Sequence, residues 1–446
     1  MNISISRLVS GTFWTLGAFG LGTAIRLLSN IILARLLAPQ LFGLMLIVNT
    51  LSIGVQLISD IGIGQNIIYS KNANDPRYYN TAWTLQVVRS AALWLVFMAI
   101  SLPAARFYGD PVLAAVLPVS SVSIILGGFT AISPAMSQKR MEFARLNIFN
   151  LIVTSISTGI VILLARLDPT IWALAFGGVA GSAVSMIASY FLLPDIRHRF
   201  YIYKPYVWDI VGFGKWIFLN SIIYFLSNNF DRLYLAKVIP LALLGVYGIA
   251  RNISDMLGAV AGRLGESVVF PFIASHQNVS RDDLRQQLVS IRLKFLLLAA
   301  LGGSLFIATA DLAIKLVYDE RYHAASWMLP ILVIGAWFSM LAAINESTLL
   351  GLGMPSYGAI ANGVRLSFLV FGLPLSLKLK GLAGCIVTLG LVEVCRYVVI
   401  LLGQKREFFS FAKQDLAITL TMFMLVGLWE WLRWVVGLGT SFDSFT

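Results

Sequence analysis

Stretches of about twenty apolar residues, separated by short polar segments, recur along the chain and constrain its fold more than any other feature. A helix of roughly 20 apolar residues crosses the hydrocarbon core of a bilayer. Backbone that faces lipid must satisfy its own hydrogen bonds, so stretches of this length are expected to be helical. The thirteen candidate spans are 11–35, 41–68, 83–105, 112–135, 147–166, 170–193, 213–237, 241–267, 293–317, 326–350, 358–377, 381–402 and 415–437. The sequence therefore predicts an all-α polytopic membrane protein.

The composition agrees with a chain whose surface faces lipid. Hydrophobic residues make up 58% of the 446 residues and charged residues only 12%, with a mean hydropathy of +0.82. A soluble domain carries roughly 25% charged residues. With the N-terminus in the cytoplasm, the cytoplasmic loops hold 17 lysines and arginines and the opposite loops 8. This asymmetry favours that orientation. The net charge of +12 is then explained by topology, and no nucleic-acid partner is expected.

The polar connections are too short for an extramembrane catalytic domain. The largest, 194–212 and 274–292, have about twenty residues each. The sequence contains neither a glycine-rich phosphate loop of the ATPase type nor a Gly-x-Ser-x-Gly nucleophile motif. The three histidines lie in separate loops and predict no metal site. We therefore expect no enzyme and no cofactor, and leave coupling to a proton or a sodium ion open.

The two halves of the chain resemble each other at a constant offset, the one that takes Trp14 to Trp216. In each half a long helix ends in Leu-Ala-basic, a short turn containing proline follows, and a glycine opens the next helix. The other matching pairs are 33–35 and 235–237, Gly43 and Gly245, and, one position short of the same offset, Pro39 and Pro240. Repeats offset by six helices keep the same orientation, and in transporters the substrate path runs between such repeats.

Polar residues follow one face of several predicted spans at three- and four-residue spacing. Such faces are expected to line a watered path, although small polar residues also serve to pack helices together. The candidate lining residues are Ser29 and Asn30 on the first span, Asn49 and Gln56 on the second, and Tyr224 and Asn228 on the seventh.

Arginine, and no lysine, occupies the interior of the predicted spans. An arginine at the centre of a span costs about 2.5–3.5 kcal/mol on insertion scales, and such residues mark substrate or ion paths. For Arg232, an ion pair with a nearby acid is the simpler interpretation. For Arg396, which lies one turn after Glu393, such an ion pair stays open as an alternative to substrate binding. The candidate substrate-binding residues are Arg26, Arg89, Arg251, Arg365 and Arg396. Because the guanidinium fork donates paired hydrogen bonds to phosphate, these residues predict an anionic substrate such as a pyrophosphate.

Carboxylates accompany these arginines within the spans. Asp60, Asp231, Asp255 and Glu346 are candidates either to neutralise the arginines when the path is empty or to bind a coupling ion. Structural pairing is the alternative for each of them. Glu346 is the first candidate for ion coupling.

Four segments resemble a known family. Residues 31–68, ILARLLAPQLFGLMLIVNTLSIGVQLISDIGIGQNII, resemble the second-helix signature of the polysaccharide transport family. This family is the Wzx-type flippase branch of the multidrug/oligosaccharidyl-lipid/polysaccharide (MOP) exporter superfamily. SPAMSQKRMEFARL (133–146), FDRLYLAKVIPLALLGVYGIAR (230–251) and LLGLGMP (349–355) are similar to later segments of the family, in the expected order.

The resemblance implies a MOP-type fold with two six-helix lobes in a V around a cationic cavity. It also implies alternating access and a polyprenyl-pyrophosphate-linked oligosaccharide as cargo, exported for O-antigen, capsule or exopolysaccharide. Arg251, in the Tyr-x-x-x-Arg that begins at Tyr247, is the residue most directly matched, and Arg26 matches by position. Expected partners are the glycolipid, membrane lipids, and export components such as a glycan polymerase. The expected location is the bacterial inner membrane.

On this basis residues 1–200 are predicted to form the N-lobe (helices 1–6) and 201–402 the C-lobe (helices 7–12). Residues 403–446 form a C-terminal extension whose candidate thirteenth helix departs from the twelve-helix norm. Two other functions stay open at this point: a cation-coupled multidrug exporter of the same superfamily, and a membrane glycan polymerase or ligase. The arginines argue against the first, and the short outer loops argue against the second.

Overall fold

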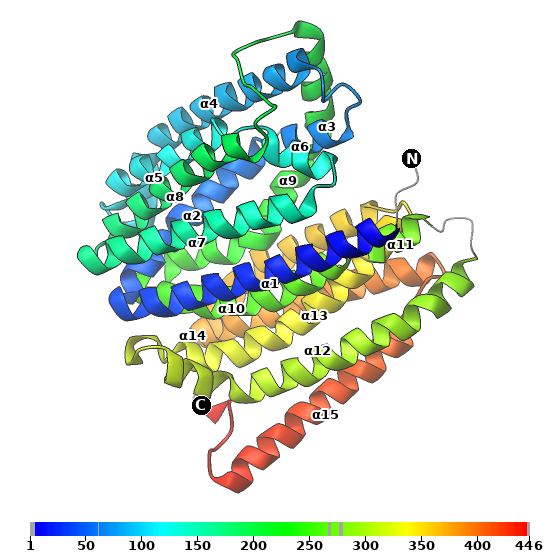
Figure 1. Ribbon diagram of the computed structural model, residues 1–446. Helices are drawn as coiled ribbons and strands as arrows, with labels where there is room; N and C mark the ends of the chain where they lie inside the picture. The colour runs from blue at the N-terminus through cyan, green and yellow to red at the C-terminus, as the bar shows by residue number, and fades with distance from the viewer. Residues whose placement is uncertain (1–4, 61, 266–268, 276–279, 444–446) are drawn as a thin grey trace. The chain divides into compact units, whose positions relative to one another are not determined.

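The computed structural model describes residues 5–60, 62–265, 269–275 and 280–443, and its elements are helices (Figure 1). They are α1 (Ile5–Leu36), α2 (Pro39–Ile58), α3 (Ile63–Tyr69), α4 (Pro76–Tyr108), α5 (Leu113–Gly128), α6 (Ser133–Lys139), α7 (Phe143–Leu167), α8 (Ile171–Leu192), α9 (Lys204–Val238), α10 (Leu241–Leu264), α11 (Phe270–Ser275), α12 (Arg281–Val317), α13 (Ala325–Gly351), α14 (Ser356–Arg406) and α15 (Ala412–Val436), with a 3-10 turn at Glu320–Tyr322. The predicted all-α class is confirmed.

Many of these helices are long enough to cross a bilayer. Among the described residues, nine helices have the length and apolar composition of a membrane span, and there are ten if the bent pair α5 and α6 is one span. Large apolar side chains remain exposed along them, for example Leu298 at 71% and Phe371 at 75%. The chain is a multi-pass membrane protein.

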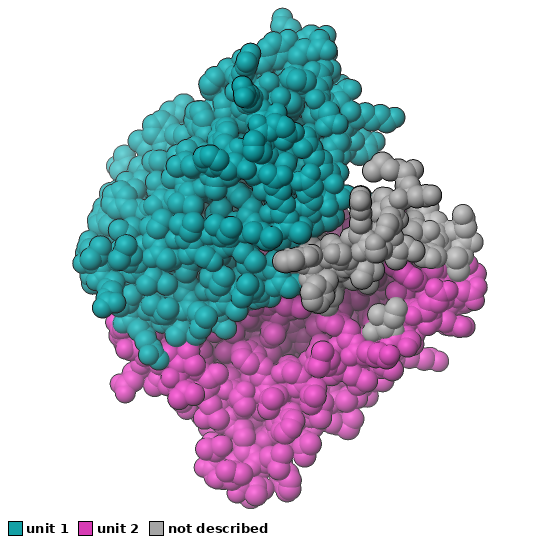
Figure 2. Space-filling model, viewed as in Figure 1, with its two compact units in different colours: residues 1–225, 235–242 teal, residues 226–234, 243–446 magenta. Residues whose placement is uncertain are grey.

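The chain divides into two compact units (Figure 2). Unit 1 holds residues 1–225 and 235–242, and unit 2 holds residues 226–234 and 243–446, so α9 contributes to both. The C-terminal extension 403–446 belongs to unit 2. The predicted lobe boundary at residue 200 stays a prediction.

The helix boundaries repeat along the chain as the sequence repeat does. Helix α1 ends at Leu36 and α2 begins at Pro39, while α9 ends at Val238 and α10 begins at Leu241. Both boundaries are therefore separated by the same offset as the tryptophan pair of the sequence repeat. This agreement supports duplication of a helix–turn–helix unit.

Helix α14 contains two predicted spans joined by a sharp turn. Lys380 and Gly381 have non-helical backbone angles, and Gly381 has a φ of 59°, which glycine adopts without steric cost. Beyond the turn the chain runs back along itself, because Cys385 contacts Leu373 and Arg365 pairs with Glu393. The predicted boundary between spans 358–377 and 381–402 therefore lies at the turn of a helical hairpin.

Two predicted continuous spans are wrong, because each is broken into two helices. The predicted span 41–68 is divided into α2 and α3, and the predicted span 112–135 into α5 and α6, which meet at a bend of 49°. At the first break the Asp60 carboxylate accepts the Gly62 N–H at 3.0 Å, and Gly62 has a left-handed φ of 65°. The Asx turn therefore lies between Ser59, the C-cap of α2, and Gly62, the N-cap of α3, where glycine adopts the left-handed φ without steric cost.

Side chains of α4 satisfy the carbonyl groups that these breaks leave without helical partners. Arg89 donates through Nε to Ser59 O at 2.8 Å and through Nη2 to Gln56 O at 2.6 Å. Three residues earlier, Gln86 Nε2 donates to the carbonyls of Gly128 (2.9 Å) and Thr130 (3.0 Å) at the other break. Since irregular backbone at membrane depth must find partners within the protein, α4 makes both breaks tolerable.

The segment that connects α8 to α9 is bound to the beginning of α4 (Figure 1). The N–H groups of Arg199, Tyr201 and Tyr203 donate to the side chains of Asn80, Thr84 and Thr81 at 2.8–3.1 Å. His198 turns inward: its Nε2 accepts the N–H of Ile132 at 2.9 Å, and its ring lies against Trp83. The connection is therefore a fixed part of unit 1.

Helix α15 runs parallel to α12 and is joined to it by two ion pairs. Arg292, about three turns into α12, pairs with Asp415 in the first turn of α15 at 2.6 Å, and Asp311 pairs with Arg433 near the ends of both helices at 2.6 Å. Figure 1 shows the two helices side by side. Arg292 and Asp311 are about 28 Å apart along α12 at 1.5 Å per residue, which is close to the hydrocarbon thickness. Helix α15 has the length and apolar composition of a membrane span.

We predict that the Asp311–Arg433 pair stabilises unit 2 strongly. Its side chains are 6% and 8% exposed, so Arg433→Gln leaves Asp311 buried without its cation. Breaking a buried pair costs about 3–5 kcal/mol. The thermal unfolding temperature of the purified protein in detergent should fall clearly, and the exchange Asp311→Arg/Arg433→Asp should recover part of the loss. As the control, Asp319→Asn breaks an exposed pair and should change little. Equal unfolding temperatures for Arg433→Gln and wild type would contradict the prediction.

We also predict that the connection between α8 and α9 weakens in mild acid. Burial lowers the pKa of His198 to about 4, against about 6.5 in an unfolded chain. Because the unfolded chain then binds the proton more readily, stability is fully present above about pH 6.5 and is lost as the pH falls towards 4.

Limited proteolysis between residues 193 and 204 should therefore accelerate from pH 7.5 to pH 5. In His198→Gln, which keeps an acceptor for Ile132 but cannot titrate, the acceleration should be smaller. The same acceleration in wild type and His198→Gln would contradict this assignment, and His323→Gln is the matched control.

Candidate functional site

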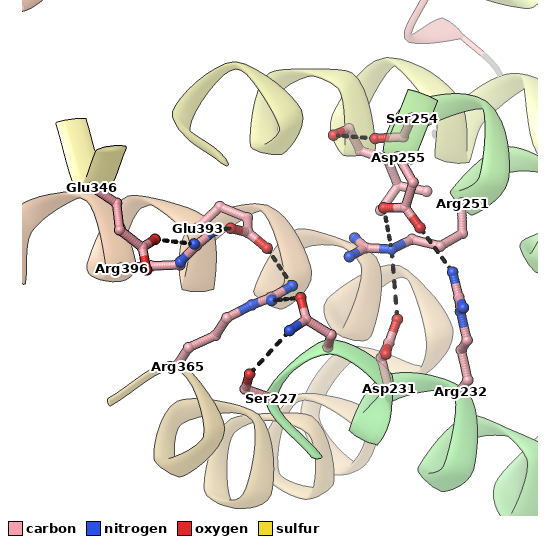
Figure 3. A network of polar contacts seen from close by, with 12 residues as sticks. Ser227, Asp231, Arg232, Arg251, Ser254, Asp255, Glu346, Arg365, Glu393 and Arg396 are labelled. Carbon is pink, nitrogen blue, oxygen red and sulfur yellow. Dashed lines mark hydrogen bonds and ion pairs between the residues drawn. The ribbon is translucent and has the colours of Figure 1, made fainter. Parts of the chain in front are cut away.

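Charged side chains of unit 2 gather in two adjoining clusters within its membrane-embedded helices (Figure 3). The first cluster joins α9 to α10. Arg251 Nε lies 3.1 Å from Asp255 and 3.7 Å from Asp231, and Arg232 donates to the other oxygen of Asp255 at 2.8 Å. The Tyr247 hydroxyl donates to Asp231 as well. Two arginines and two carboxylates thus share one set of contacts.

Local helix geometry explains why the first cluster forms. Tyr247, Arg251 and Asp255 follow each other at four-residue spacing, so they lie on one face of α10. Asp231 and Arg232 lie near the end of α9, where the short turn 239–240 folds α10 back. Ser254 donates to the carbonyl of Leu332 at 2.9 Å and attaches the same part of α10 to α13.

The second cluster joins the hairpin of α14 to α13 and α9. Arg365, on the first arm, pairs with Glu393 on the second at 2.6 Å and donates to the Asn228 amide oxygen. Arg396 donates to Glu346 of α13 at 2.7 Å and lies 3.9 Å from Glu393. The carboxylate of Glu346 fits against α14 because residue 358 is glycine. A Cβ at this position would lie only 2.2 Å from Oε1 of Glu346.

The charges of the two clusters balance. Four arginines (Arg232, Arg251, Arg365 and Arg396) meet four carboxylates (Asp231, Asp255, Glu346 and Glu393). In addition, the Nε groups of Arg232, Arg365 and Arg396 lie buried without a hydrogen-bond acceptor among the described residues. The clusters are therefore neutral as a whole and still hold donors that a ligand can engage.

The predicted residues of unit 1 fall into different surroundings. Arg26 lies exposed on α1, and no ion pair joins it to another described residue. Arg89 is occupied by the carbonyls at the end of α2, so its contacts are those of a helix cap. Of the remaining predicted residues of this unit, Ser29 is buried, Asn30 and Asp60 are partly buried, and Asn49, Gln56 and Tyr224 are exposed.

Sequence reasoning missed the central place of Glu393. It lies between Arg365 and Arg396, and it is 4% exposed. Its position one turn before Arg396 gave a signal, but the hairpin that brings Arg365 to it from the other arm of α14 gave none. Arg396 has its shorter contact with Glu346, and Arg232 pairs across to α10.

An apolar cavity of about 230 Å³ lies in unit 2 between α10, α12, α13 and α15. Gly302 and Gly303 of α12 and Trp337 of α13 are among its lining residues, and a Cβ added at either glycine would meet no atom within 4 Å. Leu257 and Val260 also line the cavity, and they lie on α10 in the turns that follow Arg251. The described residues contain no group of three histidines, cysteines or carboxylates that could hold a metal ion.

The sequence matches a known family over about two thirds of its length. The family described as "Polysaccharide biosynthesis protein" matches residues 32–327. The lipopolysaccharide biosynthesis protein WzxC of Escherichia coli K12 is 22% identical over 350 residues, which cover 76% of this chain and 68% of WzxC.

Two solved structures share the fold. The lipid II flippase MurJ, in an inward closed conformation, matches with a TM-score of 0.75 and 12% identity over 94% of this chain and 92% of MurJ. An inward-facing multidrug resistance transporter of the MATE family, in the MOP superfamily, matches with a TM-score of 0.67 and 16% identity over 90% of this chain and 96% of its own. The predicted MOP fold and the predicted resemblance to Wzx-type proteins are confirmed.

We predict that Arg365 and Glu393 stabilise the fold only as a pair. Arg365→Gln or Glu393→Gln alone leaves the other charge buried and should lower stability by about 3–5 kcal/mol. The double variant removes both charges and should be more stable than either single variant. Thermal unfolding in detergent measures all three variants, and additive losses in the double variant would show that the two side chains do not act together.

Proposed function

Because the chain belongs to the polysaccharide biosynthesis protein family, we propose that it is a flippase for a polyprenyl-pyrophosphate-linked oligosaccharide. The glycolipid moves from the cytoplasmic to the outer leaflet of a bacterial inner membrane, where it supplies the synthesis of O-antigen, capsule or exopolysaccharide. The related WzxC is named for lipopolysaccharide biosynthesis, and MurJ, which shares the fold, is a flippase for lipid II. Both names support glycolipid cargo.

The observation that carries the proposal is the balanced arginine–carboxylate network of unit 2. An ionisable group inside a membrane helix is costly, and a cluster of such groups is a candidate functional site. Each arginine of the network has an acid, as structural pairing requires, and Arg365 in addition donates to Asn228 and keeps an Nε without an acceptor among the described residues. A pyrophosphate suits such a site because guanidinium groups bind phosphate oxygens in pairs.

The carboxylates have a defined part in this mechanism. In the empty transporter they neutralise the arginines, since an unpaired buried charge would destabilise the helices. When the pyrophosphate arrives, its oxygens take over contacts of Arg365, Arg396 and Arg251, and the displaced carboxylates take up protons. When the substrate is released, these carboxylates lose their protons and the pairs form again. Ligand binding therefore exchanges one set of ion pairs for another without leaving a bare charge.

The predicted topology belongs to the same proposal. The N-terminus lies in the cytoplasm, because the loops on that side hold the excess of lysine and arginine. Arg26, exposed on α1 of unit 1, stays a predicted substrate-binding residue. The apolar cavity beside α12 gives hydrocarbon a place near the network, and the proposal assigns it to the lipid part of the substrate.

Transport with the charges removed in pairs tests the proposal. In cells that lack the chromosomal gene, Arg365→Gln/Glu393→Gln should reduce surface polysaccharide at least tenfold at equal protein level. Lipid-linked oligosaccharide should accumulate on the cytoplasmic leaflet at the same time. The matched control is Asp311→Asn/Arg433→Gln, which removes a buried pair outside the network and should keep export close to that of wild type.

Unchanged export in the network variant would overturn the assignment of the site. The same cells challenged with cationic drugs distinguish the multidrug alternative. A change in drug resistance with normal polysaccharide export would support drug export and contradict the flippase.

A further inference from the structure

The connection between α8 and α9, together with the first turns of α9, carries an exposed patch that no part of the transport path requires. We call residues 197–208 the surface strap. Its basic side chains Arg197, Arg199 and Lys204 are exposed, and so are the apolar side chains of Phe200 (67%), Ile202 (58%) and Trp208 (74%). The segment contains no aspartate or glutamate. Basic and large apolar groups therefore share one short surface.

The strap is held in place through its backbone. Alternate N–H groups, from Arg199 to Tyr203, donate to side chains of α4. His198 anchors the strap from beneath, against Trp83. Because these backbone donors are satisfied and the chain is fixed, the exposure of Phe200 and Ile202 is a property of a defined surface rather than of a flexible linker.

The positive charges of the strap are not neutralised by the described acids of unit 1. Asp195 pairs with Arg140 at 2.7 Å, and Asp75 pairs with Arg77 at 3.1 Å. No ion pair joins the three basic residues of the strap to another described residue. Asp209 follows directly after the strap and still leaves an excess of positive charge. The strap thus presents this charge to an anionic partner outside the protein.

The strap continues a surface that faces lipid. It follows shortly after α8, whose last turns expose Ile187 (55%) and Phe191 (74%). Helix α8 has the composition of a membrane span, so its end lies at the height of the lipid headgroups. Aromatic side chains favour the headgroup level, and basic side chains beside it are attracted to anionic lipid.

From this continuity and charge we propose that the surface strap docks on the bilayer and binds the headgroups of anionic phospholipids. Arg197, Arg199 and Lys204 contact the phosphates, while Phe200, Ile202 and Trp208 enter the boundary between headgroups and acyl chains. The strap thereby fixes the depth of unit 1 in the membrane. This binding is independent of the cargo, so it holds whether or not the chain flips a glycolipid.

Lipid binding by the full-length protein tests the charges. Native mass spectrometry in a mild detergent compares retention of phosphatidylglycerol with that of phosphatidylcholine of the same acyl chains. Wild type should retain more phosphatidylglycerol, and Arg197→Gln/Arg199→Gln/Lys204→Gln should lose at least half of that excess. The control Lys405→Gln/Arg406→Gln/Lys413→Gln removes three exposed positive charges from unit 2 and should keep it. Equal losses in both triple variants would overturn the proposal.

The depth of the strap is tested by a probe on its apolar side. An environment-sensitive fluorophore is attached to Ile202→Cys, in a background where Cys385 and Cys395 are serine, and the protein is reconstituted in vesicles. Emission should shift to the blue in vesicles of phosphatidylcholine mixed with phosphatidylglycerol, relative to pure phosphatidylcholine, and the triple strap variant should remove the difference. A spectrum typical of water in both kinds of vesicle would refute docking on the bilayer and point to a protein partner.

Discussion

A charge inside hydrocarbon must have a partner, and the organisation of unit 2 follows from this requirement. Arg251, Arg365 and Arg433 each face carboxylates on a neighbouring helix or helical arm. The pairs therefore determine which helices pack together: α9 with α10, the two arms of α14, and α12 with α15. The Asp311–Arg433 pair, with its two short contacts, serves the fold. The α9–α10 and α13–α14 clusters differ from it because several arginines and carboxylates share one set of contacts there, and our proposal assigns the exchange of partners with a ligand to these clusters.

The same requirement applies to the backbone of unit 1. The breaks after α2 and α5 expose carbonyl groups at membrane depth, and Arg89 and Gln86 of α4 bind them. Arginine within a span thus has two physical roles in one protein: it neutralises carboxylates in unit 2 and caps a helix in unit 1. Both roles answer the absence of water, so the presence of an intramembrane arginine alone does not identify a substrate site.

Much of the fold could be predicted from sequence because lipid imposes one simple rule on each span. The spans, the repeat of the two halves and the turn near Gly381 follow from local hydropathy and from short sequence matches. The break after α2 was missed because Asp60 and Gly62 interrupt an apolar stretch by hydrogen bonding, which leaves its mean hydropathy high. For the site, sequence identified the arginines and most of the acids. It did not identify their pairing, since Arg365 with Glu393 and Arg396 with Glu346 depend on tertiary contacts between separate helices or helical arms.

The parallel pairing of α12 with α15 has a consequence for how the protein is made. Helix α12 is synthesised well before α15, with α13 and α14 between them, and its Arg292 and Asp311 find their carboxylate and guanidinium partners only when α15 has been made. Until then α12 holds two charges that a bilayer tolerates poorly, one near each end of its hydrocarbon-spanning part. A chain truncated before residue 412 leaves both charges in the membrane without these ion-pair partners, so we expect α12 to be held less firmly in it than in the longer chain. Helix α15 therefore completes the neutralisation of a helix that enters the membrane three helices earlier.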